Sequence, residues 1–261
     1  MTASSTFHAL HRSGLLILPN AWDAASAVLA RAAGARAVAT TSAGVAWALG
    51  WPDGAQPPEA ELLGAIARMV RVAGVPVSAD VEAGFSDDPA TAAAFVRRVV
   101  ETGAAGINIE DGADAPELLA DKIAAIRAVA GSGLFINARC DLWLRGIGPA
   151  EGRLEAAAAR AALYRAAGAD GLFMPGVTEA ATITALVGLG MPLNLLARPG
   201  LADAAGLEAL GVRRLSAGSN IAAAAYATVD ALTRGFLADG RSEPQIAAAM
   251  DYGALNALMA G

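Results

Sequence analysis

Val75-Pro-Val-Ser-Ala-Asp-Val-Glu-Ala-Gly84 is a short apolar run that ends in two carboxylates, Asp80 and Glu82. Gly106-Ile-Asn-Ile-Glu-Asp-Gly112 repeats the arrangement with Glu110. Runs that are apolar without alternation are typical of parallel strands covered on both faces. A charge at the end of such a strand is costly unless a partner neutralises it, and several converging carboxylates suit a hard cation. The two stretches therefore predict parallel strands whose ends hold Mg²⁺, with Mn²⁺ as the other option.

The alternation of an apolar run with an Ala-rich amphipathic stretch continues along the whole chain. The eight predicted strands are 15–19, 37–41, 75–79, 106–109, 134–138, 171–174, 193–196 and 214–217. The predicted helices between them are 23–33, 58–72, 89–102, 116–130, 152–167, 179–188 and 203–210. Several of these helices begin at Pro or an acidic residue and close at Gly, as helix ends do. Eight such units without a linker predict an α/β fold, a (β/α)₈ TIM barrel that spans residues 1–261 as one domain.

The segment from about 219 to 261 is predicted to be a helical tail, with breaks at Gly235 and Gly240. This tail is longer than one barrel helix requires. Two uses remain open from the sequence: packing against a partner subunit, or a simple C-terminal cap on the same barrel.

The composition limits the classes of partner. The chain has 55% hydrophobic and 17% charged residues, enough to bury a large core. Its net charge of −6 and the absence of a basic run argue against nucleic acid. No apolar run reaches the roughly 18 residues of a membrane span, and no signal core opens the sequence. We therefore expect a cytoplasmic protein with a small-molecule partner.

The sequence offers little histidine or cysteine chemistry. The two histidines, His8 and His11, precede every predicted strand, which disfavours a Ser–His–Asp triad and a His-ligated zinc site. Proton transfer would then fall to carboxylates, Lys, Tyr, hydroxyls or water. Cys140 is the single cysteine and is interpreted as a small buried side chain rather than a reactive thiol.

Further polar residues follow the predicted strands, where the active site of a barrel lies. Arg139 ends the fifth strand, and its planar fork suits a carboxylate or phosphate, although a structural ion pair with one of the acids is also possible. Asn194 follows the seventh strand and either binds substrate or satisfies nearby backbone groups.

The loop after the second predicted strand consists of small residues. Thr41, Ser42, Ala43 and Gly44 would let backbone N–H groups approach an oxyanion closely, but many turns share this pattern.

Other polar or aromatic residues at strand ends have structural interpretations. Asp23 is predicted to be a helix N-cap residue. Asp111 and Asp141 are interpreted as solvated loop acids, and Trp47 and Trp51 as core or lid packing.

Taken together, these motifs resemble the isocitrate lyase and phosphoenolpyruvate mutase superfamily over nearly the whole chain. The stretches that resemble it are Leu18-Pro-Asn-Ala-Trp-Asp-Ala24, Thr40-Thr-Ser-Ala-Gly-Val-Ala46, Leu49-Gly-Trp-Pro-Asp-Gly54, Ala79-Asp-Val-Glu-Ala-Gly-Phe85, Gly106-Ile-Asn-Ile-Glu-Asp111, Ile136-Asn-Ala-Arg-Cys-Asp141, Gly168-Ala-Asp-Gly-Leu-Phe-Met-Pro-Gly176, Pro192-Leu-Asn194 and Gly211-Val-Arg-Arg-Leu-Ser216. The resemblance implies a Mg²⁺-dependent barrel enzyme that breaks or forms a C–C or P–C bond beside a pyruvyl unit, through an enolate.

The resemblance also implies roles for individual residues. Asp80, Glu82 and Glu110 would hold the metal, partly through water, and Arg139 would grip the substrate carboxylate. Asp53 would lie on a gating loop and order water or substrate.

Within the loop after the second strand, Thr41 or Ser42, with the N–H groups of Ala43 and Gly44, would cradle the same pyruvyl unit. The resemblance further implies a tetramer whose subunits exchange C-terminal helices.

The chain departs from the superfamily pattern at three places. The stretch Glu110-Asp-Gly-Ala-Asp-Ala-Pro-Glu117 lacks the Cys, His and Lys of the lyase acid loop. Met174-Pro-Gly176 stands where the lyases carry Glu and the mutase His, and Gly54 follows Asp53 where the mutase has Asn.

The metal and carboxylate residues remain, and loss of CO₂ needs no general acid at the leaving group. We therefore predict a Mg²⁺-dependent lyase or decarboxylase for an oxaloacetate-like di-acid, acting as a homotetramer or dimer. The alternatives are a P–C bond enzyme, either mutase or phosphonopyruvate hydrolase, and an α-keto-acid binding protein without catalysis.

Overall fold

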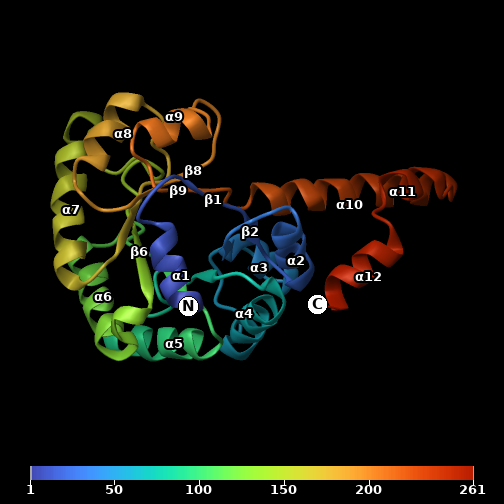
Figure 1. The fold of residues 1–261 in the computed structure, drawn as a ribbon, viewed down its shortest axis with the longest axis horizontal. Coiled ribbons are helices and arrows are strands. Elements are labelled where there is room, and N and C mark those ends of the chain that lie inside the picture. Colours follow the sequence, from blue (N-terminus) through green and yellow to red (C-terminus); the bar gives the residue numbers. More distant parts are fainter. Residues whose placement is uncertain (1, 261) are drawn as a thin grey trace.

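A computed structural model describes residues 2–260 and shows parallel strands enclosed by helices (Figure 1). The strands pair in the order β1-β9-β8-β7-β6-β5-β4-β3-β2. Their bounds are β1 Leu16–Leu18, β2 Asn20–Ala21, β3 Val38–Thr40, β4 Val77–Asp80, β5 Gly106–Glu110, β6 Phe135–Arg139, β7 Gly171–Phe173, β8 Leu193–Leu196 and β9 Arg214–Ser216. Strand β1 falls within the predicted strand 15–19, whereas β2 lies just beyond it; only Pro19, which has no N–H to donate, separates the two. The ring of strands is therefore nearly closed, and the predicted TIM-type barrel is confirmed.

Seven helices follow the predicted pattern around the strands. They are α2 Ala24–Ala32, α4 Glu59–Ala73, α5 Pro89–Glu101, α6 Pro116–Ala130, α7 Arg153–Ala167, α8 Ala180–Val187 and α9 Ala204–Ala209. Asp23 caps α2, as predicted: its carboxylate accepts from Ser26 N at 2.7 Å, and the Ser26 hydroxyl accepts from Asp23 N. Gly74 and Gly168 end α4 and α7 in the left-handed conformation that glycine adopts most readily.

Helix α1, Ala3–Leu10, closes the barrel at the end opposite the predicted site and was not predicted from the sequence. Its Phe7 is fully buried and meets Phe135 of β6 edge-to-face, with ring centroids 5.5 Å apart. A Cβ on Gly106 would lie 2.7 Å from the Phe7 ring, so the glycine makes room for this plug. His11 stacks on Phe135, and burial lowers the pKa of His11 to about 3, which leaves the ring neutral.

The tail contains three helices, α10 Asn220–Asp239, α11 Glu243–Ala248 and α12 Tyr252–Ala260. Helix α10 extends away from the barrel, and α12 folds back toward α2 (Figure 1). Arg31 Nη2 of α2 donates to Leu258 O at 3.4 Å. The helical tail is confirmed, but the predicted break at Gly235 is wrong, because α10 runs through it and ends at Gly240 with φ +68°. Across residues 2–260, no helix is both long enough and apolar enough to cross a membrane.

Candidate active site

A cavity of about 140 Å³ opens where the barrel strands end. Its walls are formed by Asn20, Thr41, Ser42, Ala43, Asp53, Asp80, Asn108, Arg139, Leu144, Phe173, Pro175, Leu196, Ser216, Gly218 and Ser219. Six predicted site residues are among them, and they come from distant parts of the sequence. The cavity is smaller than the roughly 300–1,000 Å³ typical of drug-sized ligands and suits a short acid.

The three predicted metal ligands lie at neighbouring strand ends, but only Asp80 borders this cavity. The backbone N–H of Asp80 donates to Thr40 Oγ1 at 2.8 Å, and its carboxylate accepts from Glu82 N at 3.3 Å. Glu82 has φ +49°, a left-handed conformation that is unusual outside glycine. Within the described part of the chain, no three His, Cys, Asp or Glu side chains are close enough to enclose a metal together.

The carboxylates at this mouth raise one another's pKa values. Burial raises the pKa of Asp80 above its usual value. It also raises the pKa of Glu82 to about 7 and the pKa of Glu110 to about 8. Crowding adds to the burial, because Asp80 raises the pKa of both glutamates. Without a cation these buried carboxylates favour their neutral forms, and because the donors are all oxygen, a hard divalent cation would fit here. Asp80, Glu82 and Glu110 would hold the ion, partly through water, since Mg²⁺ usually keeps several waters.

Arg139 ends β6 and faces the same cavity. Its Nε and Nη2 donate to the two Asp141 oxygens at 2.7 and 2.9 Å, and its Nη1 lies 2.5 Å from Glu110 Oε2. Burial alone would lower the pKa of Arg139, but Glu110 and Asp141 raise it above its usual value. A guanidinium has five N–H donors. The pair with Asp141 fixes its plane, and the terminal nitrogens retain donors for a ligand anion.

The predicted cradle is the start of a helix rather than a loop, because α3 spans Ser42–Ala48. Thr41, Ser42 and Ala43 line the cavity, whereas Gly44 does not. A Cβ on Gly44 would lie 2.7 Å from Thr41 Cγ2 and 2.8 Å from Trp22 Cβ. The glycine at this position is therefore explained by close packing.

Asn194 lies one layer below the cavity rather than on its wall. It is buried, and Ser216 Oγ, which does line the cavity, donates to Asn194 Oδ1 at 3.1 Å. In this structure Asn194 supports a wall residue.

Asp111 and Asp141 are not solvated loop acids, so that interpretation is wrong. Both are buried, at 2% and 0% exposure. Asp111 accepts from Tyr164 OH at 2.6 Å and from Arg160 Nη1 at 2.5 Å, both on α7. It also accepts from Asp141 N at 2.9 Å, and Asp141 in turn holds Arg139. These two acids thus connect an outer helix to the guanidinium in the cavity.

Sequence reasoning missed two buried cations near the site. Arg214 of β9 is 1% exposed, and its Nη2 donates to Asn108 Oδ1 at 3.1 Å. The available signal was an arginine two residues before Ser216, on the same face of a strand. Lys122 of α6 is also buried, and its Nζ donates to Ala83 O at 2.9 Å, beside Glu82.

The chain matches the family model of phosphoenolpyruvate phosphomutase over residues 7–237. An uncharacterized protein of Mycobacterium tuberculosis is 38% identical over 221 residues, which cover 82% of both chains. An oxaloacetate decarboxylase of Bradyrhizobium (strain BTAi1) is 34% identical over 204 residues, covering 70% of this chain and 67% of that protein.

Solved structures agree with this match. A protein from Burkholderia cenocepacia J2315 is 37% identical, with a TM-score of 0.89 and coverage of 99% of this chain and 96% of the other. A phosphonopyruvate hydrolase in complex with oxalate and Mg²⁺ is 24% identical, with a TM-score of 0.88 and coverage of 100% and 95%, and supports the fold. The chain therefore belongs to the phosphoenolpyruvate phosphomutase family and is an enzyme of the phosphoenolpyruvate mutase/isocitrate lyase superfamily.

Proposed function

We propose that the protein is a Mg²⁺-dependent decarboxylase or lyase for a short α-keto di-acid, with oxaloacetate as the leading substrate. The observation that carries this proposal is the juxtaposition, in one small cavity, of the carboxylate of Asp80 and the oriented guanidinium of Arg139. The similarity to a Bradyrhizobium oxaloacetate decarboxylase supports the same substrate class.

The residues on the cavity wall suggest a separate role for each in binding the substrate. Arg139 would hold the carboxylate beside the keto group, and Thr41 and Ser42 would offer hydroxyl donors to the same pyruvyl unit. When bound, Mg²⁺ would supply Lewis acidity that polarises the keto group. Asp53 is exposed at the rim and would order water or substrate there.

Decarboxylation needs little acid–base chemistry at the leaving group. The bond to the distal carboxylate breaks, CO₂ departs, and the electron pair moves into the keto group to give an enolate. Water then protonates the enolate carbon to form pyruvate. This fits a cavity whose walls contain no His, Lys or Cys among the described residues.

The proposal is tested by the metal dependence of turnover. With Mg²⁺ present, oxaloacetate should yield pyruvate above the uncatalysed rate, and EDTA should return the rate to background. Mn²⁺ should restore activity after EDTA treatment. Turnover that survives EDTA would contradict the proposal. A new phosphorus NMR signal from phosphonopyruvate, without oxaloacetate turnover, would instead assign P–C bond chemistry.

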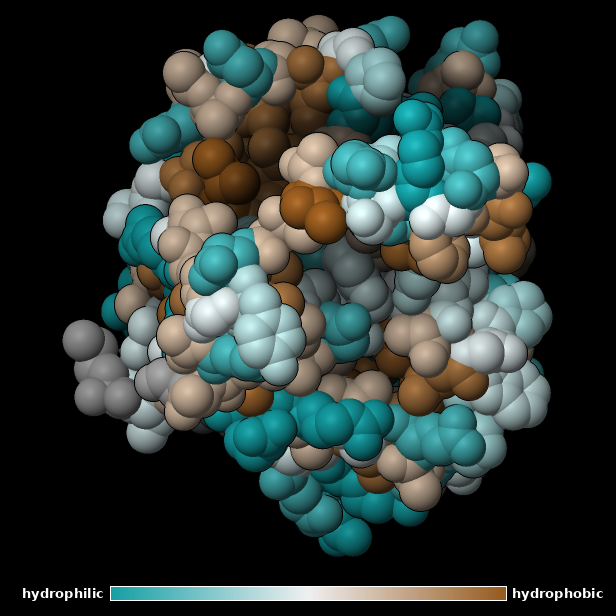
Figure 2. Space-filling view, turned by 90° about the vertical axis from the view of Figure 1, so that its right-hand side faces the viewer, coloured by the Kyte–Doolittle hydropathy of each residue, from teal (hydrophilic) through white to brown (hydrophobic). Residues whose placement is uncertain are grey.

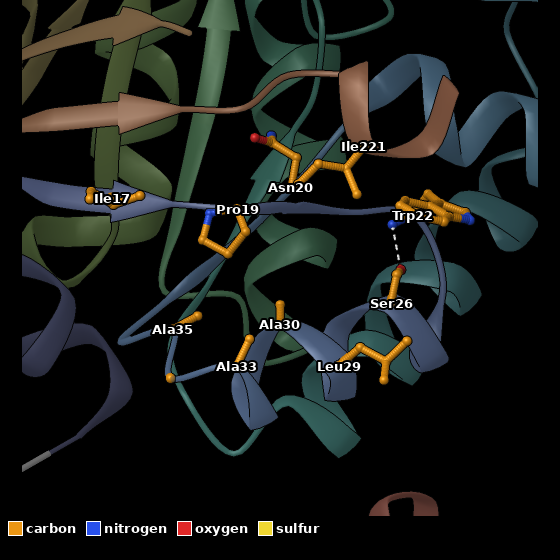
Figure 3. A pocket seen from close by; sticks show the side chains of 11 residues that line it. Ile17, Pro19, Asn20, Trp22, Ser26, Leu29, Ala30, Ala33, Ala35 and Ile221 are labelled. Atoms are coloured by element: carbon orange, nitrogen blue, oxygen red, sulfur yellow. Dashed lines mark hydrogen bonds between the residues drawn. The ribbon is translucent and has the colours of Figure 1, made fainter. Parts of the chain in front are cut away.

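We also infer that the tail packs on a second copy of the chain. A cavity of about 400 Å³ lies on the outside of the barrel between β1–β2 and α2, with Ile17, Trp22 and Leu29 on its walls (Figure 3). Helix α10 exposes Val229 and Phe236, at 58% and 50%, which lie seven residues apart and share one face. Figure 2 looks onto this side and shows hydrophobic side chains lining a hollow in the surface. An apolar helix and an apolar groove on the same chain are complementary between copies.

This assembly predicts that Val229→Asp separates the subunits. A charge in the apolar contact would be desolvated without a partner, so the mutant should shift from an oligomer to a monomer in light scattering after size exclusion. Ala231→Asp, an equal charge at an exposed position of α10 about 160° around the helix from Val229, should leave the mass unchanged. A monomeric wild-type protein at micromolar concentration would refute the assembly.

A further inference from the structure

Asn108 lies on the floor of the candidate active site. It occupies the middle of β5, is 3% exposed, and is among the residues that line the 140 Å³ cavity. In the strand register it stands beside Asp80 of β4 and Asn137 of β6. Asn108 therefore stands between Asp80 of β4 and β6, the strand that ends in Arg139.

Two donors fix the orientation of the Asn108 amide. Arg214 Nη2 and Asn137 Nδ2 donate to its Oδ1 at 3.1 and 2.9 Å. A guanidinium has only donors, so it can face the amide oxygen but not the amide NH₂. Arg214 is sealed in the barrel above Phe7, with its guanidinium 5.9 Å from that ring centroid, and cannot swing away. The contact with Arg214 therefore excludes the flipped amide.

The amide nitrogen is consequently the free end. Within residues 2–260, Asn108 Nδ2 donates to no protein atom. Among the described residues, the fully buried side-chain atoms without a partner are His11 Nε2, Ser78 Oγ, Asn194 Nδ2 and Arg214 Nη1. Asn108 Nδ2 also has no partner but is not among these fully buried atoms. Part of its surface is therefore accessible from the cavity that the residue lines.

We propose that Asn108 is a substrate-binding residue whose NH₂ donates to an inward-facing oxygen of the bound acid, and that Arg214 is the positioning residue that aims it. The chemistry recognised is a carboxylate or enolate oxygen, because only an acceptor satisfies this donor. A ligand with a methyl group at that position would leave the amide unpaired and bind more weakly. The inference deepens the proposed function and rests on it.

The test compares oxalate binding, in the presence of Mg²⁺, by the full-length wild type and three variants in calorimetry. Asn108→Ala should weaken binding about 10- to 100-fold, the loss of a hydrogen bond to a charged group. Asn108→Asp keeps the shape and can pair with Arg214, but it cannot donate and repels an anion, so it should lose at least as much. Ser78→Ala is the control, because it removes a fully buried polar side chain that neither lines the cavity nor hydrogen-bonds to Asn108, and it should bind within about threefold of wild type.

The outcomes separate the two proposals. If Asn108→Asp folds and binds oxalate as wild type does, the role of Asn108 is structural and the inference is overturned, while the proposed function stands. If the wild type neither binds oxalate nor consumes oxaloacetate, the proposed function fails and the inference fails with it. Should Asn108→Ala not fold, the Asp variant decides, because its thermal midpoint is expected to stay near that of wild type.

Discussion

Asp80→Asn is expected to lower the turnover of oxaloacetate by at least about 10³-fold, because several kcal/mol of metal assistance to the reaction is lost with the ligand. Asp80 is the one predicted ligand that borders the cavity, so neither Glu82 nor Glu110 can replace it from its present position. Steady-state kinetics at saturating Mg²⁺ measures the effect on kcat.

The stability of the same variant should move in the opposite direction. Burial raises the pKa of Asp80, which means that the folded state disfavours its charged form. A neutral side chain of the same size removes that penalty at pH 7, so the thermal midpoint should be equal to or higher than that of wild type. Asp23→Asn is the matched control: asparagine caps helices as well as aspartate does, so neither activity nor stability should change. Normal turnover in Asp80→Asn would remove the metal hypothesis.

Arg139→Lys is expected to raise the KM for oxaloacetate by about 10- to 100-fold, the equivalent of about 1.5–3 kcal/mol for a charge-assisted hydrogen bond. Lysine keeps the charge but cannot hold two oxygens of a carboxylate in one plane. The same change also loosens Asp141, which is fully buried and would keep only Arg145 Nε, at 3.0 Å, as a side-chain donor. We therefore expect a lower free energy of unfolding in urea as well.

Two readouts separate binding from stability in this variant. Oxalate titration at a temperature where the variant is fully folded isolates the ligand contact. Arg97→Lys is the control, since Arg97 is exposed and its contact with Glu101 is 3.6 Å long. A KM within twofold of wild type in a folded Arg139→Lys would show that the guanidinium does not grip the substrate.

The sequence was sufficient for the barrel because its signals are local and repeated. Each apolar run is followed by a helix cap, and the terminal carboxylates and Arg139 stand at strand ends where geometry places them together. The eight-residue α1 gave no comparable signal, because what keeps it in place is the contact of Phe7 with Gly106 and Phe135, far away in sequence.

The same reason explains the errors within the site. Asp111 follows a strand and looks like a loop acid, but its partners Arg160 and Tyr164 come from α7, 49 and 53 residues further along the chain. Asp141 pairs with the nearby Arg139 and Arg145, and its complete burial is a product of the tertiary fold. Arg214 was missed because its partner Asn108 is 106 residues away in the chain. The sequence shows that Arg214 is a charged residue in a predicted strand, but it does not show that Asn108 is its partner.

Helix α1 has a consequence for the passage of small molecules. Phe7 fills the far end of the barrel, so we expect small molecules to reach the cavity from the rim where the exposed Asp53 lies. Products would then leave by the same route. A product that dissociates slowly from the rim would delay binding of the next substrate molecule, so the rate of product release sets an upper limit on kcat.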